Sequence, residues 1–187
     1  GLPYYVEGTS ANINALTHSP AGVSRTPEFF RTWKGFKTLT RTEAVAIDRA
    51  AKTVRIRHLE TGQEKDLAYD KLVLATGGRP FRPPIPGLEL PNVWFMTHPD
   101  DAASLVSEME RQGLRKAVLV GAGFIGLEVA EALINRGLDV TMVEMAPQVM
   151  PGILDEDIAR LAQIHMEDNG VELVLGETVT ALEGSQR

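Results

Sequence analysis

The sequence contains no cysteine, and this absence removes several kinds of chemistry from the chain itself. Disulfide bonds, thiolate metal sites and thiol nucleophiles all require cysteine, so none of them is expected within these 187 residues. Histidines are few and lack the spacing of metal ligands: His18, His58, His98 and His165. We therefore expect no metal site in this chain.

Long apolar runs and an excess of positive charge are also missing. No apolar run approaches the roughly 20 residues that a membrane span requires. The formal net charge is −6, which provides no attraction for nucleic acid or for an anionic membrane. The content of 43% hydrophobic and 24% charged residues indicates a soluble globular protein. Because an initiator methionine and a signal sequence are absent too, we expect an internal piece of a longer cytoplasmic protein.

The most informative stretch that is present runs from Lys116 to Glu144. It opens with an apolar run, Ala117–Val120, which is too short for a helix and typical of a buried parallel strand. A glycine pattern follows at once: Gly121, Ala122, Gly123, Phe124, Ile125 and Gly126. A helix is then predicted to about Arg136, and a second strand, Val140–Val143, ends on Glu144.

Each part of this stretch has a physical role in binding a dinucleotide. Gly121 permits a tight turn, Gly123 lets a pyrophosphate approach the backbone, and Gly126 lets the helix pack closely on the strand. The helix N-terminus offers free N–H groups to the phosphates. Glu144 stands about 20 residues further on, where an acid holds the ribose 2′-OH and disfavours a 2′-phosphate. We therefore expect this stretch to bind a dinucleotide, and NADH rather than NADPH. The alternative to dinucleotide binding is that the glycines only form a turn in an unrelated α/β unit.

The first 90 residues are predicted to hold one clear helix and several strands. Residues 1–25 are turn-rich, with at most a short helix around Ser10–Leu16. A cap, a proline and an acid at Thr26-Pro27-Glu28 predict a helix over Pro27–Trp33. An apolar strand should later run through Tyr69–Gly77 and present Thr76 and Gly77 at its carboxyl end, where ligands bind in α/β sheets. Strands with a period of two are expected at Phe36–Leu39, Ala44–Ile47, Thr53–His58 and Glu64–Leu67.

The remaining residues predict a parallel sheet covered by helices. Prolines between Arg79 and Pro91 indicate a linker. Two helices are expected, one from Pro99 and one capped by Asp155. Their predicted inward residues are Ala102, Leu105, Val106 and Met109 in the first, and Ile158, Leu161, Ala162 and His165 in the second. Further strands are expected at Asn92–Met96, Val171–Leu175 and Thr178–Leu182. The C-terminal half therefore has the order β-α-β-α-β.

The order of these motifs resembles the flavoprotein pyridine nucleotide-disulfide oxidoreductases, in particular the branch of CoA-disulfide reductases, NADH oxidases and persulfide reductases. The resemblance covers nearly the whole chain. It implies an α/β fold in which residues 91–187 form a Rossmann-like NAD(P)-binding domain, truncated at its C-terminus. Residues 1–90 would be part of an FAD-binding domain with a β-meander, without its N-terminal dinucleotide-binding unit. The segments that carry the resemblance are Gly1-Leu2-Pro3-Tyr4-Tyr5, Thr26-Pro27-Glu28, Tyr69–Gly77, Pro83–Gly87, and Gly121–Glu144 with the trailing Met150-Pro151.

The resemblance also implies roles for single residues. Members of this branch carry a redox-active cysteine that would stand just before Gly1, so no catalytic residue is expected in this chain. The NAD contacts would be Gly121, Ala122, Gly123, Phe124, Ile125, Gly126, Glu128 and Glu144. Phe124 would cover the nicotinamide face of the flavin, and Glu128 would reach the nicotinamide carboxamide. Thr76 and Gly77 would lie by FAD, and Lys34 near the CoA phosphates. Glu128 and Lys34 have plainer alternatives as charges that favour the helix dipole.

The function implied for the intact parent is an NADH- and FAD-dependent disulfide reductase. Hydride would pass from NADH through FAD to a cysteine-bound disulfide, with CoA-disulfide, a persulfide or a peroxide as the small-molecule substrate. The parent would be a homodimer through a missing C-terminal domain. This chain alone should retain no FAD and be inactive. Two alternatives are an NADH-dependent FAD reductase component for ferredoxin, rubredoxin or nitrite, which lacks the cysteine, and a non-enzymatic NAD-binding module.

Overall fold

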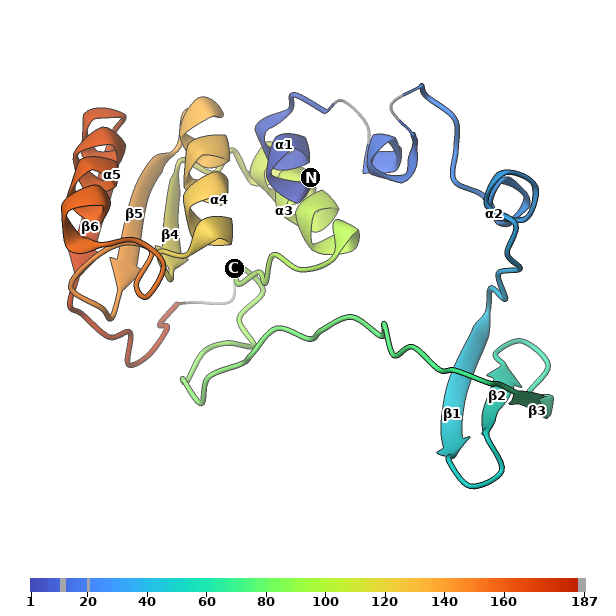
Figure 1. Ribbon diagram of the computed structural model, residues 1–187. Helices are drawn as coiled ribbons and strands as arrows, with labels where there is room; N and C mark the ends of the chain where they lie inside the picture. The colour runs from blue at the N-terminus through green and yellow to red at the C-terminus, as the bar shows by residue number, and fades with distance from the viewer. Residues whose placement is uncertain (11–12, 20, 185–187) are drawn as a thin grey trace. The chain divides into compact units, whose positions relative to one another are not determined.

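The protein forms two compact units. The computed structural model describes residues 1–10, 13–19 and 21–184 (Figure 1). One unit consists of Gly1–Leu16 together with Arg79–Arg187, and the other is Thr17–Gly78. These limits follow from contacts within the chain. The functional division into an FAD part and an NAD part at residues 90 and 91 is a separate matter and stays a prediction.

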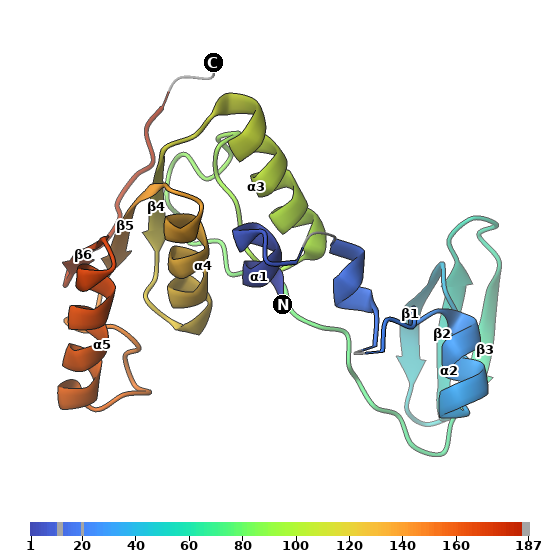
Figure 2. The ribbon, with the colours of Figure 1, turned by 90° about the horizontal axis from the view of Figure 1, so that it is seen from above.

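A three-stranded parallel sheet is the centre of the first unit. Its strands are β4 (Lys116–Val120), β5 (Asp139–Glu144) and β6 (Val171–Leu175), in the order β4-β5-β6. The helices α4 (Phe124–Asn135) and α5 (Glu156–Asp168) connect successive strands, and Figures 1 and 2 show both on one side of the sheet. The alternating residues of β5 are buried, because this strand lies between its two neighbours. The predicted β-α-β-α-β order is thus confirmed.

The position of β4 differs from the expectation of a buried strand. Among the described residues β4 pairs only with β5, so it forms an edge of the sheet. Val118 is 65% exposed and Val120 is 60% exposed. The apolar run correctly predicted a strand, but it carried no information about how many neighbours the strand has.

The first unit also contains two α-helices and most of a 3₁₀ helix. The helix α1 (Leu2–Glu7), which was not predicted from the sequence, packs on α4 and on α3 (Pro99–Gln112). A 3₁₀ helix occupies Ile13–Thr17, within the region where a short helix was expected; residues 11 and 12 lie outside the described part. In α3, Ala102, Val106 and Met109 are buried as predicted. Within the part of the chain that the structure describes, no helix is both long and apolar enough to cross a membrane.

The inward face of α5 was predicted only in part: Ala162 is half-buried and packs against the core, but the other three predicted residues are exposed. Ile158 is 48% exposed and Leu161 is 63% exposed, and His165 is also exposed. The buried residues are Ala159 and Met166. Small Ala159 has no accessible surface, which places the helix backbone close to the protein interior on that side. The bulkiest apolar stripe was therefore not the one that packs.

The second unit combines one helix with an antiparallel meander. The helix α2 (Pro27–Lys34) begins as predicted, with the Thr26 hydroxyl accepting a hydrogen bond from the Phe29 N–H, and ends at Gly35 in the left-handed conformation. The strands β1 (Thr42–Asp48), β2 (Thr53–His58) and β3 (Glu64–Ala68) pair in sequence order, with an irregularity in β1 between Ala44 and Ala46.

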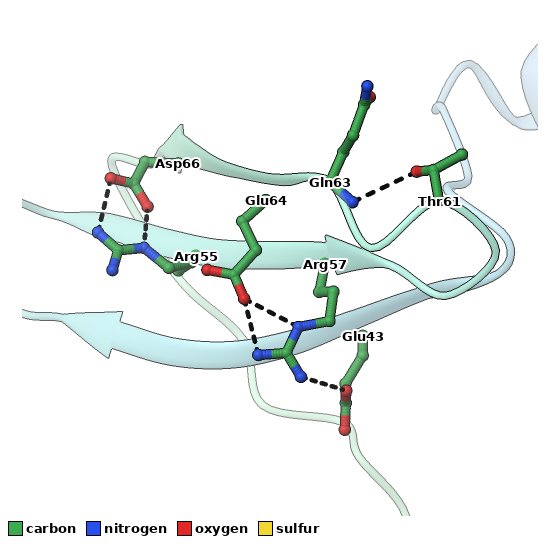
Figure 3. A network of polar contacts seen from close by, with 7 residues as sticks. All are labelled: Glu43, Arg55, Arg57, Thr61, Gln63, Glu64 and Asp66. Atoms are coloured by element: carbon green, nitrogen blue, oxygen red, sulfur yellow. Dashed lines mark hydrogen bonds and ion pairs between the residues drawn. The ribbon is translucent and has the colours of Figure 1, made fainter.

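Cross-strand ion pairs cover one exposed face of this meander. Figure 3 shows Arg55 beside Asp66, at 2.9 Å, and Arg57 between Glu64, at 2.7 Å, and Glu43, at 4.0 Å. The hydrogen bond from Arg55 lowers the pKa of Asp66. All five side chains are at least one-third exposed, so this network is a solvated surface.

Four predicted strands are not formed in this structure. These segments contain no strand residues: Phe36–Leu39, Tyr69–Gly77, Asn92–Met96 and Thr178–Leu182. A strand is stable only when neighbours accept and donate its backbone hydrogen bonds. In the apolar segment that leads to Thr76 and Gly77, Val73 is 83% exposed and Leu74 is 69% exposed. Its composition suits a buried strand, but the Tyr69 N–H to Lys52 carbonyl bond at its start is not continued into a described strand pairing.

Candidate functional site

The glycine-rich loop between β4 and α4 has the geometry that its sequence predicts. Gly121 has φ +102°, a conformation that other residues rarely adopt, and its N–H donates to the Val143 carbonyl at 2.8 Å. A Cβ added to Gly126 would lie 2.1 Å from the Gly121 carbonyl oxygen. Only glycine therefore allows the start of α4 to approach the loop this closely.

Gly123 is a glycine for a different reason. Its φ of −84° suits any residue, and a Cβ added there would meet no atom within 4 Å. Gly123 is the N-cap of α4, and no side chain caps the helix. The open space beside Gly123 and the uncapped first turn match what a pyrophosphate requires: close approach to the backbone and free N–H groups.

Ala122 connects the loop to the two segments that flank it. Its N–H donates to Glu144 Oε2 at 2.8 Å, and its carbonyl accepts from the Met150 N–H at 2.8 Å. Glu144 is 8% exposed, and its Oε1 accepts from the Ala146 N–H at 2.9 Å. Both oxygens of this buried carboxylate thus have backbone donors, which offsets the cost of removing the charge from water.

Met150 also takes part in this arrangement, and its contact with the glycine loop was not predicted from the sequence. It is 4% exposed and has φ +50°, which is uncommon for a residue with a side chain. Its N–H bond to Ala122 holds the loop after β5 against the glycine loop. The only signal was Met150-Pro151 in the resemblance, and it carried no structural role.

Other predicted contact residues lie at the start of α4. Phe124 is 62% exposed and Ile125 is 57% exposed, so both present apolar surface beside the glycine loop. Glu128, one turn further on, lines a small crevice that α4 forms with Pro3 and Tyr4 of α1. The side chain of Glu128 is therefore available on the side of α4 that faces α1. Among the described residues, no cluster of His, Asp or Glu has an arrangement that would hold a metal ion.

The residues predicted to contact FAD and CoA belong to the second compact unit. Thr76 and Gly77 lie in irregular, exposed chain, because the strand expected to carry them is not formed. Lys34 is the exposed last residue of α2. By themselves these exposed residues could supply only part of a flavin site.

A cavity of about 910 Å³ lies beside β4 in the first unit. Its walls are mostly apolar and include Trp94, Leu105 and Val118, but Gly121, Ile125 and Gly126 of the predicted nucleotide site line it as well. Such a lining does not suit the phosphates of a dinucleotide, which need N–H donors. The uncapped start of α4 and the buried carboxylate of Glu144 are the part of this unit that fits a nucleotide.

Comparison with known proteins agrees with this geometry. The family described as pyridine nucleotide-disulphide oxidoreductase matches residues 2–187. A curated NADH oxidase of Methanocaldococcus jannaschii is 36% identical over 187 residues, which is 100% of this chain and 40% of that protein. A CoA-dependent NAD(P)H sulfur oxidoreductase of Pyrococcus furiosus is 32% identical over the same length and is also covered to 40%. The chain thus spans about two-fifths of the length of these relatives.

Solved structures of NAD-dependent oxidoreductases resemble the chain as well. An NAD-dependent persulfide reductase from A. fulgidus is 43% identical with a TM-score of 0.85, over 94% of this chain and 32% of that one. A water-forming NADH oxidase from Lactobacillus brevis, solved with NADH bound, is 31% identical with a TM-score of 0.84, over 100% of this chain and 39% of that one. Structural likeness and sequence likeness therefore extend over both compact units of the chain.

Proposed function

This chain belongs to the pyridine nucleotide-disulphide oxidoreductase family, and from that premise we propose that it supplies the NADH-binding part of a longer FAD-dependent reductase. The single observation that carries the proposal is the contact between Glu144 and the glycine loop, 2.8 Å from Oε2 to the Ala122 nitrogen. This contact fixes a carboxylate beside the loop whose amides would hold the pyrophosphate. A dinucleotide needs both features at this separation, one for the ribose and one for the phosphates.

The proposed roles follow from position. Gly121, Gly123 and Gly126 shape the pyrophosphate site, and Glu144 accepts hydrogen bonds from the adenosine ribose hydroxyls. A 2′-phosphate would place a second negative charge beside this buried carboxylate, so NADH is favoured over NADPH. The L. brevis oxidase that resembles the chain was solved with NADH. Ala122 in the loop contributes backbone contact and Ile125 at the start of α4 contributes apolar contact, while Phe124 and Glu128 serve the nicotinamide half.

In the longer enzyme, we propose, bound NADH and FAD would supply two electrons to a cysteine that precedes Gly1, present either as a mixed disulfide or, after reaction with a peroxide, as a sulfenic acid. With one proton, reduction of the disulfide would leave a thiolate and a released thiol, and reduction of the sulfenic acid would leave a thiolate and water. The substrates would be CoA-disulfide, a persulfide or a peroxide, in keeping with relatives described as a CoA-dependent sulfur oxidoreductase and a persulfide reductase. Thr76 and Gly77 would contact FAD and Lys34 the CoA phosphates. The longer enzyme would be a homodimer.

A second candidate is an NADH-dependent FAD reductase that feeds electrons to a small electron-transfer protein. A ferredoxin reductase from Rhodopseudomonas palustris is 26% identical with a TM-score of 0.80, over 99% of this chain. Such an enzyme would need no cysteine before Gly1. The higher identity to the persulfide reductase, 43%, favours the disulfide-type enzyme.

The test is calorimetric titration of the 187-residue chain with NADH and with NADPH. The chain should bind NADH more tightly than NADPH. Replacing Glu144 with Ala should weaken NADH binding by about tenfold, because two hydrogen bonds to the ribose are lost, and should reduce the preference over NADPH. The matched control is Glu167→Ala on the exposed face of α5, which should leave both affinities unchanged. Unchanged selectivity in Glu144→Ala would remove the role assigned to this residue.

A further inference from the structure

The short helix α1 cannot hold its position by its own stability. It has six residues, and helices of this length are not stable in isolation. Val6 is fully buried, and Leu2 and Tyr5 pack against the same core, so α1 depends on contacts with the rest of its unit. Figures 1 and 2 both show α1 beside α4 and α3. What fixes α1 to α4 therefore decides where the chain at Gly1 lies.

Two consecutive residues at the end of α4 make polar contacts with the end of α1. Asn135 Nδ2 donates to Glu7 Oε1 at 2.6 Å, and Arg136 Nε donates to the Val6 carbonyl. The hydrogen bonds from Thr9 and Asn135 lower the pKa of Glu7, which keeps this carboxylate ionised as an acceptor. A carbonyl in the last turn of a helix lacks a partner within the helix, and here a cation provides one.

Arg136 is held in place from a second side. Its Nη1 lies 3.5 Å from Glu110 Oε1 on α3, and its side chain is 22% exposed. The other ion-paired arginines of the described chain are far more exposed, from 45% to 71%. A Cβ added to Gly8, at φ +97°, would lie 3.4 Å from Arg136 Nη2, so the guanidinium fits closely under the end of α1.

These contacts also give the direction of α1. Pro3 and Tyr4 share a crevice with Glu128 and Glu131 of α4. Glu7, which also lines this crevice, bonds Asn135, and Val6 bonds Arg136 just past the last turn of α4. The two helices therefore run in the same direction. The N-terminal end of α1 points along α4 toward the glycine loop and the proposed nucleotide.

We propose that Asn135 and Arg136 are positioning residues: they lock α1 onto the dinucleotide-binding helix and so fix the chain at Gly1 beside the nicotinamide half of the nucleotide. The lock stands on the contacts alone, whereas its use in catalysis rests on the proposed function. In the longer enzyme it would set the place of the residue before Gly1 relative to the reacting end of the cofactor.

The first test measures the lock without any ligand. Amide hydrogen exchange of residues 2–9 should become faster by about tenfold or more in Arg136→Met and in Asn135→Ala, because a short helix that loses a charged hydrogen bond opens more often. Arg136→Lys should restore part of the protection. Exchange in β5 should stay unchanged in all variants. The matched control is Arg111→Met, which removes an exposed arginine paired with Glu108 on α3.

The second test measures the position of Gly1. The chain has no cysteine, so Gly1→Cys introduces a single thiol whose labelling by a maleimide reports its surroundings. Bound NADH should slow this labelling several-fold, and Arg136→Met should remove the protection while leaving the NADH affinity measured by calorimetry within twofold. A thiol placed at Arg111 instead should not respond to NADH.

The outcomes separate the two proposals. Unchanged exchange in residues 2–9 of Arg136→Met and Asn135→Ala would overturn the lock, and so would an equal rise in β5, since that would indicate general destabilisation. If the rate of labelling of Gly1→Cys is the same with and without bound NADH, the positioning role would be overturned. A wild-type chain that fails to bind NADH would instead count against the proposed function and against positioning at a nucleotide, while exchange would still decide the lock.

Discussion

Gly123 and Gly126 belong to the same glycine motif, Gly123 as the N-cap of α4 and Gly126 in its first turn, yet the structure requires them for different reasons. A methyl group on Gly126 would lie 2.1 Å from the Gly121 carbonyl, whereas one on Gly123 would meet nothing within 4 Å. We therefore predict that Gly126→Ala lowers the free energy of unfolding by about 1–3 kcal/mol, the usual cost of overpacking. Gly123→Ala should leave that free energy nearly unchanged and weaken NADH binding. Urea denaturation and NADH titration of both variants make the comparison.

The opposite result would be equally informative. If Gly123→Ala bound NADH as tightly as the wild type, the open space beside Gly123 would not be the place of the pyrophosphate. If Gly126→Ala were as stable as the wild type, the contact with the Gly121 carbonyl would have to relax at little cost.

Glu144 also has a structural role that can be measured without nucleotide. Its two oxygens accept from the N–H groups of Ala122 and Ala146, and the residue is 8% exposed. In Glu144→Gln one of these acceptors becomes an amide NH₂ group, so one buried N–H loses its partner. We expect a loss of about 1–3 kcal/mol in the free energy of unfolding. The control Glu172→Gln, at an exposed carboxylate bonded to Thr141, should cost much less. Equal losses in the two variants would contradict this role.

The N-terminus of α3 illustrates stabilisation at the scale of an element. Asp101 Oδ2 accepts from the His98 N–H at 2.7 Å and from the Thr97 N–H at 3.0 Å. Asp101→Ala should cost about 0.5–2 kcal/mol of stability, the range for lost helix caps. Asp100→Ala is the matched control, because the side chain of Asp100 is 92% exposed and its N–H still reaches His98. Thermal unfolding of both variants measures the difference.

The contribution of Asp101 should depend on pH in a defined direction. Burial acts to raise the pKa of Asp101, but the hydrogen bonds from His98 and Thr97 outweigh it, and the pKa is lowered. A lowered folded-state pKa means that the stabilisation is fully present above the unfolded value, about 3.9, and is lost as pH falls through the folded value. The gap between wild type and Asp101→Ala should therefore be constant near neutral pH and close in acid. A gap that widened in acid would contradict this.

Elements with their own end signals were predictable from sequence, and so were the six strands that pair with neighbours, β1 to β6. The sequence could not show which further apolar segments would lack a partner. Caps and prolines located α2 and α3, and the glycines with Glu144 located the site around α4. The segment Tyr69–Gly77 has the composition of a strand, but a strand forms only when neighbours pair with it. Conversely, α1 has too few residues for a periodic pattern and is stabilised by packing on α4 and α3. The Met150 contact was equally invisible, because it is made by backbone atoms.

The distribution of buried residues differs strongly between the two compact units. In Thr17–Gly78 only Ile56 is a buried apolar residue among those described. The other buried apolar residues of the described chain belong to the first unit, where Leu133, Met142 and Val149 are almost completely inaccessible. The meander is stabilised instead by its backbone ladder and by exposed ion pairs, which contribute little individually. The two units should therefore differ in stability.

We predict that the chain unfolds in two steps, with Thr17–Gly78 opening first. Amide protons of β2 should exchange at least about tenfold faster than those of β5, because local opening has a lower free energy where few apolar contacts are broken. Ile56→Ala should lower the first transition, with a cost of about 2–5 kcal/mol for a truncated core residue, and leave the second in place. Met142→Ala should lower the second transition and leave the first in place. A single transition that both variants shift equally would mean that the units unfold together, and would show that contacts outside each unit's own core decide its stability.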